Sequence, residues 1–233
     1  MPKTDSKTVI DLVELTKRYD DEAGVYDALR GINLVVSEGE FVAIMGPSGS
    51  GKSTLMNIIG LLDRPSKGAY LLDGVDTNSL GNKALARLRR DKIGFVFQNF
   101  NLMPRLNVLQ NVELPLIYKR VGTSARHKRV KEVLAQVGLS DKIKNRPNRM
   151  SGGQIQRAAI ARALVNKPSI ILADEPTGNL DTKTGDEIMK LLKDLNKKGA
   201  TIVVVTHNPE VGDYADRTIV VRDGLIQQKG KKK

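Results

Sequence analysis

The sequence predicts an α/β fold with a mostly parallel central sheet, and three observations support this prediction. Short, unbroken apolar runs at Phe41–Met45, Ile170–Ala173 and Ile202–Val205 are typical of strands buried on both faces. Segments with helical spacing of apolar residues alternate with these runs, and the chain contains no internal repeat. Strand–helix alternation of this kind indicates a parallel sheet covered by helices.

The first hundred residues are expected to form five strands and one helix. The helix begins at Lys52 and ends at about Leu61, directly after a glycine-rich turn. The expected strands are Val9–Leu15, Leu29–Val36, Phe41–Met45, Ala69–Leu72 and Ile93–Phe97.

The middle of the chain has a different pattern. Residues from about 100 to 165 show helical spacing of apolar side chains and no convincing strand. An alanine-rich helix is expected after the turn at Ser151-Gly152-Gly153. Because the sheet resumes at Ile170, this stretch is expected to be a helical subdomain inserted into a single domain of residues 8–228.

One more helix is expected between the last two apolar runs. Ile188, Leu191, Leu192 and Leu195 recur at the spacing of one helix face, and Gly199 follows as a stop signal.

Composition excludes several classes of protein. With 40% hydrophobic and 27% charged residues among 233, the chain can bury a sizeable core and is not disordered. It contains no cysteine, which excludes disulfide scaffolds, cysteine-ligated metals and thiol nucleophiles. The apolar runs are far shorter than the ~20 residues that span a bilayer, and the start of the chain has no apolar signal segment. A soluble, intracellular protein is therefore expected.

The formal net charge of +12 permits two interpretations. Six cations and no acid lie between Lys119 and Lys131, and a basic tail at 229–233 adds four lysines. Such charges attract anionic lipids or nucleic acids, or they form a solvated helix face and a loose tail. The second interpretation is favoured, because only Tyr118 accompanies the run and a base-stacking surface needs interleaved aromatics. No specific nucleic-acid partner is expected.

The segment Gly46–Ser53 (GPSGSGKS) matches the phosphate-binding pattern G-x-x-x-x-G-K-[ST] at every fixed position. Its glycines let successive backbone N–H groups turn inward, and the N-terminus of the following helix favours an anion. Lys52 can reach the terminal phosphates, Ser53 can ligate Mg²⁺, and Thr54 adds a donor. The expected contacts to a nucleotide come from Gly46, Ser48, Gly49, Ser50, Gly51, Lys52, Ser53 and Thr54.

Two acids end the apolar run at Ile170. Asp174 is expected at the carboxyl end of a strand, where α/β sheets place their ligands, and can hold Mg²⁺ opposite Ser53. Glu175, one residue further, can act as general base towards an attacking water. An acidic pair at a strand end is by itself often a solvated turn, so the metal and base roles depend on the phosphate-binding loop.

The segment Met150–Gln154 (MSGGQ) lies between the phosphate-binding loop and the acidic strand end. With it, the chain resembles the nucleotide-binding subunits of ABC transporters from about Val9 to Ile226. This resemblance implies a P-loop NTPase fold with an N-terminal antiparallel β subdomain. It also implies that Ser151 and Gly153 contact the γ-phosphate of ATP held by a partner subunit. The alternative for Ser151 is a helix N-cap.

Other positions match motifs of the same family one at a time. Gln98 resembles the glutamine that touches Mg²⁺ and senses the membrane partner, and its alternative is a turn amide. His207 resembles the switch histidine that contacts the γ-phosphate and the attacking water, and its alternative is a surface or capping histidine. Asp181, in Gly178–Asp181 (GNLD), resembles the D-loop acid at the dimer interface, which is compatible with a helix N-cap. Tyr19 resembles the aromatic that stacks on adenine, although a core tyrosine beside Tyr26 is the alternative.

The chain departs from the family pattern at Met150, where leucine is usual, and at Asn208, where aspartate is frequent. Neither residue carries the assigned chemistry, so an active ATPase is expected. The segments Gln98–Pro104 (QNFNLMP) and Asn111–Leu116 (NVELPL) look like the branch that serves lipoprotein release, macrolide export and related peptide export.

The expected function is ATP hydrolysis in a head-to-tail dimer that drives a separate membrane permease for export or extraction. Such a subunit would be cytoplasmic, held at the inner face of the membrane by the permease. Two alternative functions fit the sequence less well. A non-transport ABC ATPase acting on nucleic acid would need coiled-coil arms or a second cassette, and a kinase or GTPase would have no use for the Ser151 motif. The chain has neither a long heptad insertion nor the guanine-reading Asn-Lys-x-Asp tetrapeptide.

Overall fold

The computed structural model describes residues 7–21 and 24–227, and the expected basic tail at 229–233 lies outside this range. The strands are β1 (Thr8–Asp21), β2 (Gly24–Ser37), β3 (Phe41–Met45), β4 (Lys67–Leu72), β5 (Val75–Asp76), β6 (Ile93–Val96), β7 (Ile170–Asp174), β8 (Ile202–Val205), β9 (Arg217–Arg222) and β10 (Leu225–Gln227). The helices are α1 (Lys52–Ile59), α2 (Asn82–Lys92), α3 (Val108–Tyr118), α4 (Thr123–Gln136), α5 (Gly152–Leu164), α6 (Thr182–Lys197) and α7 (Pro209–Gly212), with short 3₁₀ turns at Ser140–Lys142 and Pro147–Arg149.

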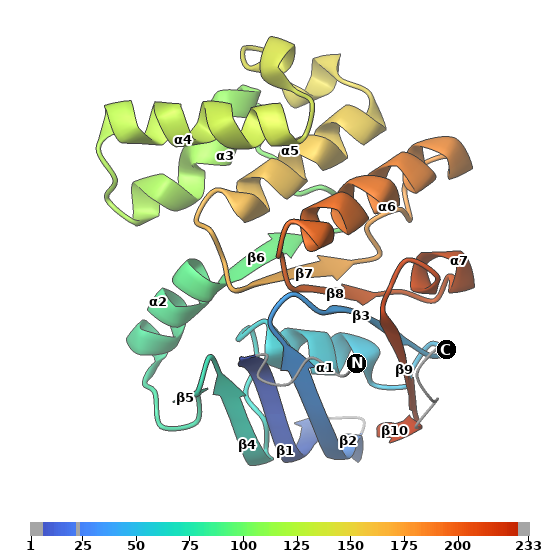
Figure 1. The fold of residues 1–233 in the computed structure, drawn as a ribbon. Coiled ribbons are helices and arrows are strands. Elements are labelled where there is room, and N and C mark those ends of the chain that lie inside the picture. Colours follow the sequence, from blue (N-terminus) through green and yellow to red (C-terminus); the bar gives the residue numbers. More distant parts are fainter. Residues whose placement is uncertain (1–6, 22–23, 228–233) are drawn as a thin grey trace.

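The central sheet has six strands in the order β10-β9-β3-β8-β7-β6 (Figure 1). Strands β9, β3, β8, β7 and β6 are parallel, and β10 is antiparallel to β9. The predicted mostly parallel sheet is therefore present. Helices α3 to α6 lie above this sheet in Figure 1, and α1 lies below it with a second, four-stranded sheet.

The three apolar runs form strands that are buried on both faces, as predicted. In β3, Phe41 and Ala43 belong to the core under α3–α6, whereas Val42 and Ile44 belong to the core shared with α1 and the second sheet. β7 and β8 alternate in the same way. Because successive side chains of a strand point to opposite faces, an unbroken apolar run supplies both cores at once.

The second sheet is antiparallel, with the strand order β2-β1-β4-β5. β1 and β2 have 14 residues each and extend well beyond the predicted segments Val9–Leu15 and Leu29–Val36. Their additional residues are mostly polar and exposed, so the apolar pattern ends before the strands do. In the extended part Tyr19 pairs directly with Tyr26 across the two strands.

Several elements carry too weak an apolar pattern for prediction. Leu85 is the buried residue of α2, because this helix has a largely charged surface. β9 begins and ends with arginine, and β10 has three residues. The strand predicted at Ile93–Phe97 ends at Val96, which places Gln98 two residues beyond it.

The segment between β6 and β7 contains α3, α4, the two 3₁₀ turns and α5. Cations of the basic run connect these helices to their surroundings. The guanidinium of Arg126 contacts buried Glu113 of α3 at 3.1 Å, and that of Arg129 donates to the Val165 carbonyl at the end of α5. The Arg126 and Arg129 side chains are only 19% and 20% exposed, so this part of the run joins the helices and is not the solvated face expected from the sequence. No helix in the described ranges is both long and apolar enough to cross a membrane.

Asp73 connects three parts of the molecule. It occupies the two-residue turn between β4 and β5, and its side chain is only 4% exposed. Its carboxylate lies 2.6 Å from the ammonium of Lys92, before β6, and 2.6 Å from the hydroxyl of Ser169, before β7. Burial alone raises the pKa of an aspartate, but the hydrogen bonds from Lys92 and Ser169 lower the pKa of Asp73 below its usual value. The second sheet is thereby joined to the edge of the central sheet.

Replacing Asp73 by asparagine is predicted to lower the free energy of unfolding by about 1–3 kcal/mol near neutral pH, because charge-assisted hydrogen bonds are lost. A carboxylate with a lowered pKa stabilises the folded state above its unfolded pKa of about 4 and loses this effect as the pH falls through the folded-state value. Urea unfolding from pH 7 to pH 3 should therefore show the difference between Asp73→Asn and the parent chain shrinking below about pH 4.

Asp223→Asn is the matched control. Asp73-Gly74 and Asp223-Gly224 both form two-residue hairpin turns with positive φ at each position, but the Asp223 side chain is 80% exposed. Its replacement should change stability by less than about 0.5 kcal/mol. Equal effects of the two substitutions would show that the turn, and not the buried carboxylate, determines the stability.

Candidate active site

The phosphate-binding loop follows β3 and leads into α1. Gly46 and Gly51 have φ values of +152° and +101°, which favour glycine. A Cβ on Gly46 would overlap the Val221 carbonyl, and one on Gly51 would come within 2.5 Å of the Ala28 carbonyl. The loop is thus confined between β2 and β9, and only glycine fits at these two positions.

The loop has the features of an anion-binding cradle. The N-cap residue of α1 is Gly51, which supplies no capping side chain, so the first N–H groups of the helix remain available to a ligand. Within the described residues, the buried Ser50 hydroxyl has no hydrogen-bond partner. Lys52 donates to the Pro47 carbonyl at 2.7 Å and therefore lies folded over the loop. Ser48 and Ser53 are exposed, and Thr54 is partly exposed. These donors fit a polyphosphate.

The register of the central sheet brings Asp174 beside this loop. Val205 of β8 pairs with Ile44 on one side and with Asp174 on the other. The loop after β3, the acid at the end of β7 and the segment after β8 therefore leave the sheet at the same edge. Burial, followed by the charge of neighbouring Glu175, raises the pKa of Asp174. Such a carboxylate gains from a nearby cation.

Glu175 is held by the segment that follows β8. Its carboxylate accepts hydrogen bonds from the Thr206 hydroxyl and from the His207 backbone N–H, both at 3.0 Å. The imidazole Nδ1 of His207 lies 2.6 Å from the same carboxylate. The Glu175 side chain is 18% exposed, whereas that of His207 is 76% exposed. A carboxylate fixed in this way, next to an accessible imidazole, can take up a proton from water at the edge of the sheet.

Gln98 lies beside the loop that follows Glu175. Its backbone carbonyl accepts a hydrogen bond from the Asn179 amide at 3.1 Å. The Gln98 side chain packs on Gly178 so closely that a Cβ there would lie 2.6 Å from Nε2. The segment after β6 and the segment after β7 are thus in direct contact.

Ser151 caps α5 in a reciprocal pair with Gln154, so the N-cap role considered from the sequence is present. Asp181 likewise caps α6 by accepting a hydrogen bond from the Thr184 N–H at 3.0 Å. A Cβ on Gly153 would lie 2.5 Å from the Thr184 methyl group. The glycine is therefore required by packing inside the chain, in addition to any approach of a ligand.

The Ser151 motif and the phosphate-binding loop face different cavities. Ser151, Gly153 and Gln154 line a cavity of about 470 Å³ with residues of α6 and of the turn before the first 3₁₀ helix. No residue of the Gly46–Ser53 loop lines this cavity. Within one chain, the structure does not bring these two predicted phosphate contacts together.

Tyr19 lies on β1, partly buried, near the start of α1. Its hydroxyl donates to Asp63 at 2.8 Å, and its ring packs on Tyr26 with a centroid distance of 5.4 Å. Partial burial and the bond to Asp63 raise the pKa of Tyr19, while the neighbouring Thr54 hydroxyl acts in the opposite direction. Tyr19 is therefore an edge residue next to the phosphate-binding helix and not a core tyrosine.

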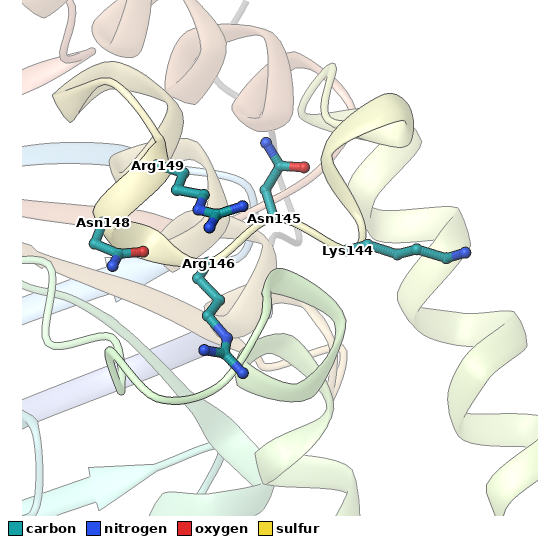
Figure 2. Close-up of a pocket in the computed structure, with 5 residues that line it drawn as sticks. All are labelled: Lys144, Asn145, Arg146, Asn148 and Arg149. Atoms are coloured by element: carbon teal, nitrogen blue, oxygen red, sulfur yellow. The ribbon is translucent and has the colours of Figure 1, made fainter.

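A cationic cavity precedes Ser151 in the sequence. Figure 2 shows Lys144, Arg146 and Arg149, with Asn145 and Asn148, around a cavity of about 290 Å³. Among the described residues, none of the three cations has an ion-pair partner. Their positive charge favours the approach of an anion to this face of the molecule.

Two supporting residues were not identified from the sequence. Thr206 holds Glu175, and its signal is its place at the strand end directly before His207. Asp63 holds both Tyr19 and Lys17, but it lies in the turn between α1 and β4, 44 residues from Tyr19, where no local pattern marks it.

Residues 29–178 match the model of the family described as "ABC transporter". An uncharacterized ABC transporter ATP-binding protein of Thermotoga maritima is 55% identical over 95% of this chain and 94% of its own length. The macrolide export ATP-binding/permease protein MacB of Bdellovibrio bacteriovorus is 52% identical over 94% of this chain, which spans a third of MacB.

A solved structure shows the same architecture. The ATP-binding cassette MJ0796, from Methanocaldococcus jannaschii, in a dimeric post-hydrolysis state bound to ADP and Pi, aligns with a TM-score of 0.85 and 51% identity over 95% of this chain and 98% of that one. These findings confirm the family resemblance and the P-loop NTPase fold indicated by the sequence motifs. The chain belongs to the ABC transporter family, as one of its ATP-hydrolysing ATP-binding proteins.

Proposed function

We propose that two copies of this chain close head to tail around two molecules of ATP and thereby drive a separate membrane permease. The separation of the Ser151 cavity from the phosphate-binding loop supports this arrangement, because one chain does not bring its two proposed phosphate-binding segments together. The dimeric state of the similar MJ0796 cassette agrees with it.

Each nucleotide would be held by residues from both chains. The loop from Gly46 to Thr54 binds the phosphates, and Tyr19 stacks on the adenine. From the partner, the second copy's Ser151 motif closes over the γ-phosphate, with Asp181 at the interface. Ser53, Asp174 and Gln98 would hold Mg²⁺, which when bound offsets the charge of the phosphates.

Hydrolysis depends on the groups at the carboxyl edge of the central sheet. Glu175 takes the proton from the attacking water, and His207 orients that water against the γ-phosphate. Closure of the two copies excludes bulk solvent from these groups. Loss of the terminal phosphate removes the bridge between the chains, so they reopen. The observation that carries this mechanism is the Glu175 carboxylate fixed by Thr206 and His207 at the carboxyl edge of the central sheet.

The permease is proposed to dock on an apolar cavity below the helical segment. This cavity of about 650 Å³ is lined by apolar side chains of β6, α3 and the segment after Gln98, and by arginines of α2 and α5. Its exposed apolar residues include Met103 and Tyr118. Similarity to MacB favours export or extraction of a lipoprotein, peptide or drug, with the ATPase held at the inner face of the membrane.

Glu175→Gln is predicted to bind ATP normally, to hydrolyse it at least about 100-fold more slowly, and to accumulate as an ATP-bound dimer. Size-exclusion chromatography with and without ATP, combined with a phosphate-release assay, checks both effects. Glu132→Gln, on the exposed side of α4, is the control and should behave like the parent chain. A Glu175→Gln variant that stays monomeric at saturating ATP would contradict the sandwich.

Ser151→Ala is predicted to abolish ATP-driven dimerisation while leaving ATP binding by the monomer intact. The substitution also removes a helix cap worth about 1 kcal/mol. Asn107→Ala removes the same kind of reciprocal cap from α3 and controls for that loss of stability. Equilibrium ATP binding and sedimentation, both in the Glu175→Gln background, provide the readouts. If both cap variants dimerise equally well, Ser151 acts only as the N-cap of α5.

Met103→Asp is predicted to prevent copurification of the permease from membranes and to leave hydrolysis by the isolated chain within about twofold of the parent. Docking would bury the aspartate carboxylate against apolar side chains, and the free energy of its desolvation would not be offset by a partner group. Leu62→Asp changes a comparably exposed apolar residue that does not line the cavity, so it should retain the permease. Retention of the permease by Met103→Asp would exclude this docking surface.

A further inference from the structure

Gln156 makes a buried hydrogen bond that the proposed mechanism does not use. It lies on α5, and its side chain is 0% exposed. Its amide Nε2 donates to the backbone carbonyl of Pro176 at 2.6 Å. Pro176 directly follows Glu175, so this bond connects α5 to the loop that carries the proposed base.

The chemistry of Gln156 indicates that the hydrogen bond is the reason for this residue type. Its neighbours on the buried side of α5 include Ala159 and Ile160, and an apolar side chain of similar volume would fill the same space. The Gln156 Oε1 atom is buried and has no hydrogen-bond partner among the described residues. A buried polar atom without a partner is unfavourable, so the amide is retained at a cost to stability.

The backbone at Glu175 needs external support. Its φ of +42° lies in the left-handed region, which is unfavourable for a residue with a side chain. On one side, the Glu175 N–H donates to the Val205 carbonyl at 2.9 Å, and its carboxylate is held by the segment after β8. On the other side, the Gly178 N–H closes a turn onto the Glu175 carbonyl, and Gln156 holds the Pro176 carbonyl inside that turn.

The helix that holds this turn also carries the Ser151 motif. Gln156 lies five residues after Ser151, a distance of about 7.5 Å along an α-helix. Gly152 and Gly153, at the first turn of α5, pack against Leu180 and Thr184, which follow the same loop. The start of α5 and the loop after Glu175 therefore form one packed unit.

We infer that Gln156 is a positioning residue for Glu175. Through its hydrogen bond to the Pro176 carbonyl, the position of α5 determines where the proposed base lies. The inference rests on the proposed function of Glu175 and Ser151. In the dimer, Ser151 would contact the nucleotide of the partner, whereas Glu175 would act on the nucleotide of its own chain. The bond from Gln156 to Pro176 consequently links the two nucleotide sites through a single helix.

The test replaces Gln156 by methionine, which keeps the length and volume of the side chain and removes the hydrogen bond. Asn196→Leu is the matched control. Asn196 is a buried amide of α6 that also donates to backbone carbonyls, those of Gly39 and Ala200, at the opposite end of the central sheet. Thermal unfolding measures the change in general stability of each variant, so that an effect on catalysis can be compared with it.

Three measurements separate positioning from general destabilisation. Gln156→Met should lower kcat for ATP about tenfold with KM within twofold, because a positioned base affects the chemical step. In the Glu175→Gln background it should still form the ATP-bound dimer. Hydrogen exchange at the amides of Glu175 and Gly178 should accelerate in Gln156→Met and remain unchanged in Asn196→Leu.

The inference is overturned if Gln156→Met retains kcat within twofold, or if exchange at Glu175 and Gly178 is unchanged. It is also overturned if Asn196→Leu loses kcat to the same extent, since the effect would then follow stability alone. Failure of the parent chain to hydrolyse ATP or to dimerise would contradict the proposed function instead. The exchange measurement needs no hydrolysis, so it distinguishes the two failures.

Discussion

The arrangement of the site depends on the parallel register of three strands. Ile44, Val205 and Asp174 lie side by side across β3, β8 and β7, fixed by backbone hydrogen bonds between buried strands. The three segments that leave these strands carry the phosphate-binding loop, His207 and Glu175. A shift of one residue in either pairing would exchange the two cores and move a proposed reacting group away from the others. The two-sided burial of the strands therefore stabilises the fold and places the chemistry at the same time.

The second part of the proposed site lies on another element. The Ser151 motif begins α5, which packs under α3 and beside α6, and it faces a cavity that the phosphate-binding loop does not line. One chain thus presents two separate surfaces, which we propose to belong to two different nucleotide sites. The hydrogen bond from Gln156 to the Pro176 carbonyl joins the helix of the Ser151 motif to the loop after Glu175, and on the inference above it would couple the two surfaces within the chain.

The sequence predicted the parts of the structure whose signals are local. The buried strands at residues 41–45, 170–174 and 202–205 follow from unbroken apolar runs, and the helix starting at Lys52 follows from its glycine-rich loop. The polar extensions of β1 and β2, the charged helix α2 and the short β10 have no such pattern, because their stability comes from tertiary contacts. The same limit applies to the site. Glu175 and Lys52 are recognisable from their motifs, whereas Asp63 and Gln156 act through partners 44 and 20 residues away.

The central claim is that one triphosphate is bound at the same time by the phosphate-binding loop of one copy and by the Ser151 motif of the other. Because the chain contains no cysteine, single substitutions give a specific disulfide test. Chains carrying Ser48→Cys are mixed with chains carrying Arg149→Cys, both in the Glu175→Gln background, and oxidised with or without ATP. The account predicts a mixed disulfide dimer that forms only with ATP, since Ser48 lies in the phosphate-binding loop and Arg149 directly precedes the Ser151 motif. Absence of an ATP-dependent mixed dimer, in a sample shown to bind ATP, would contradict it.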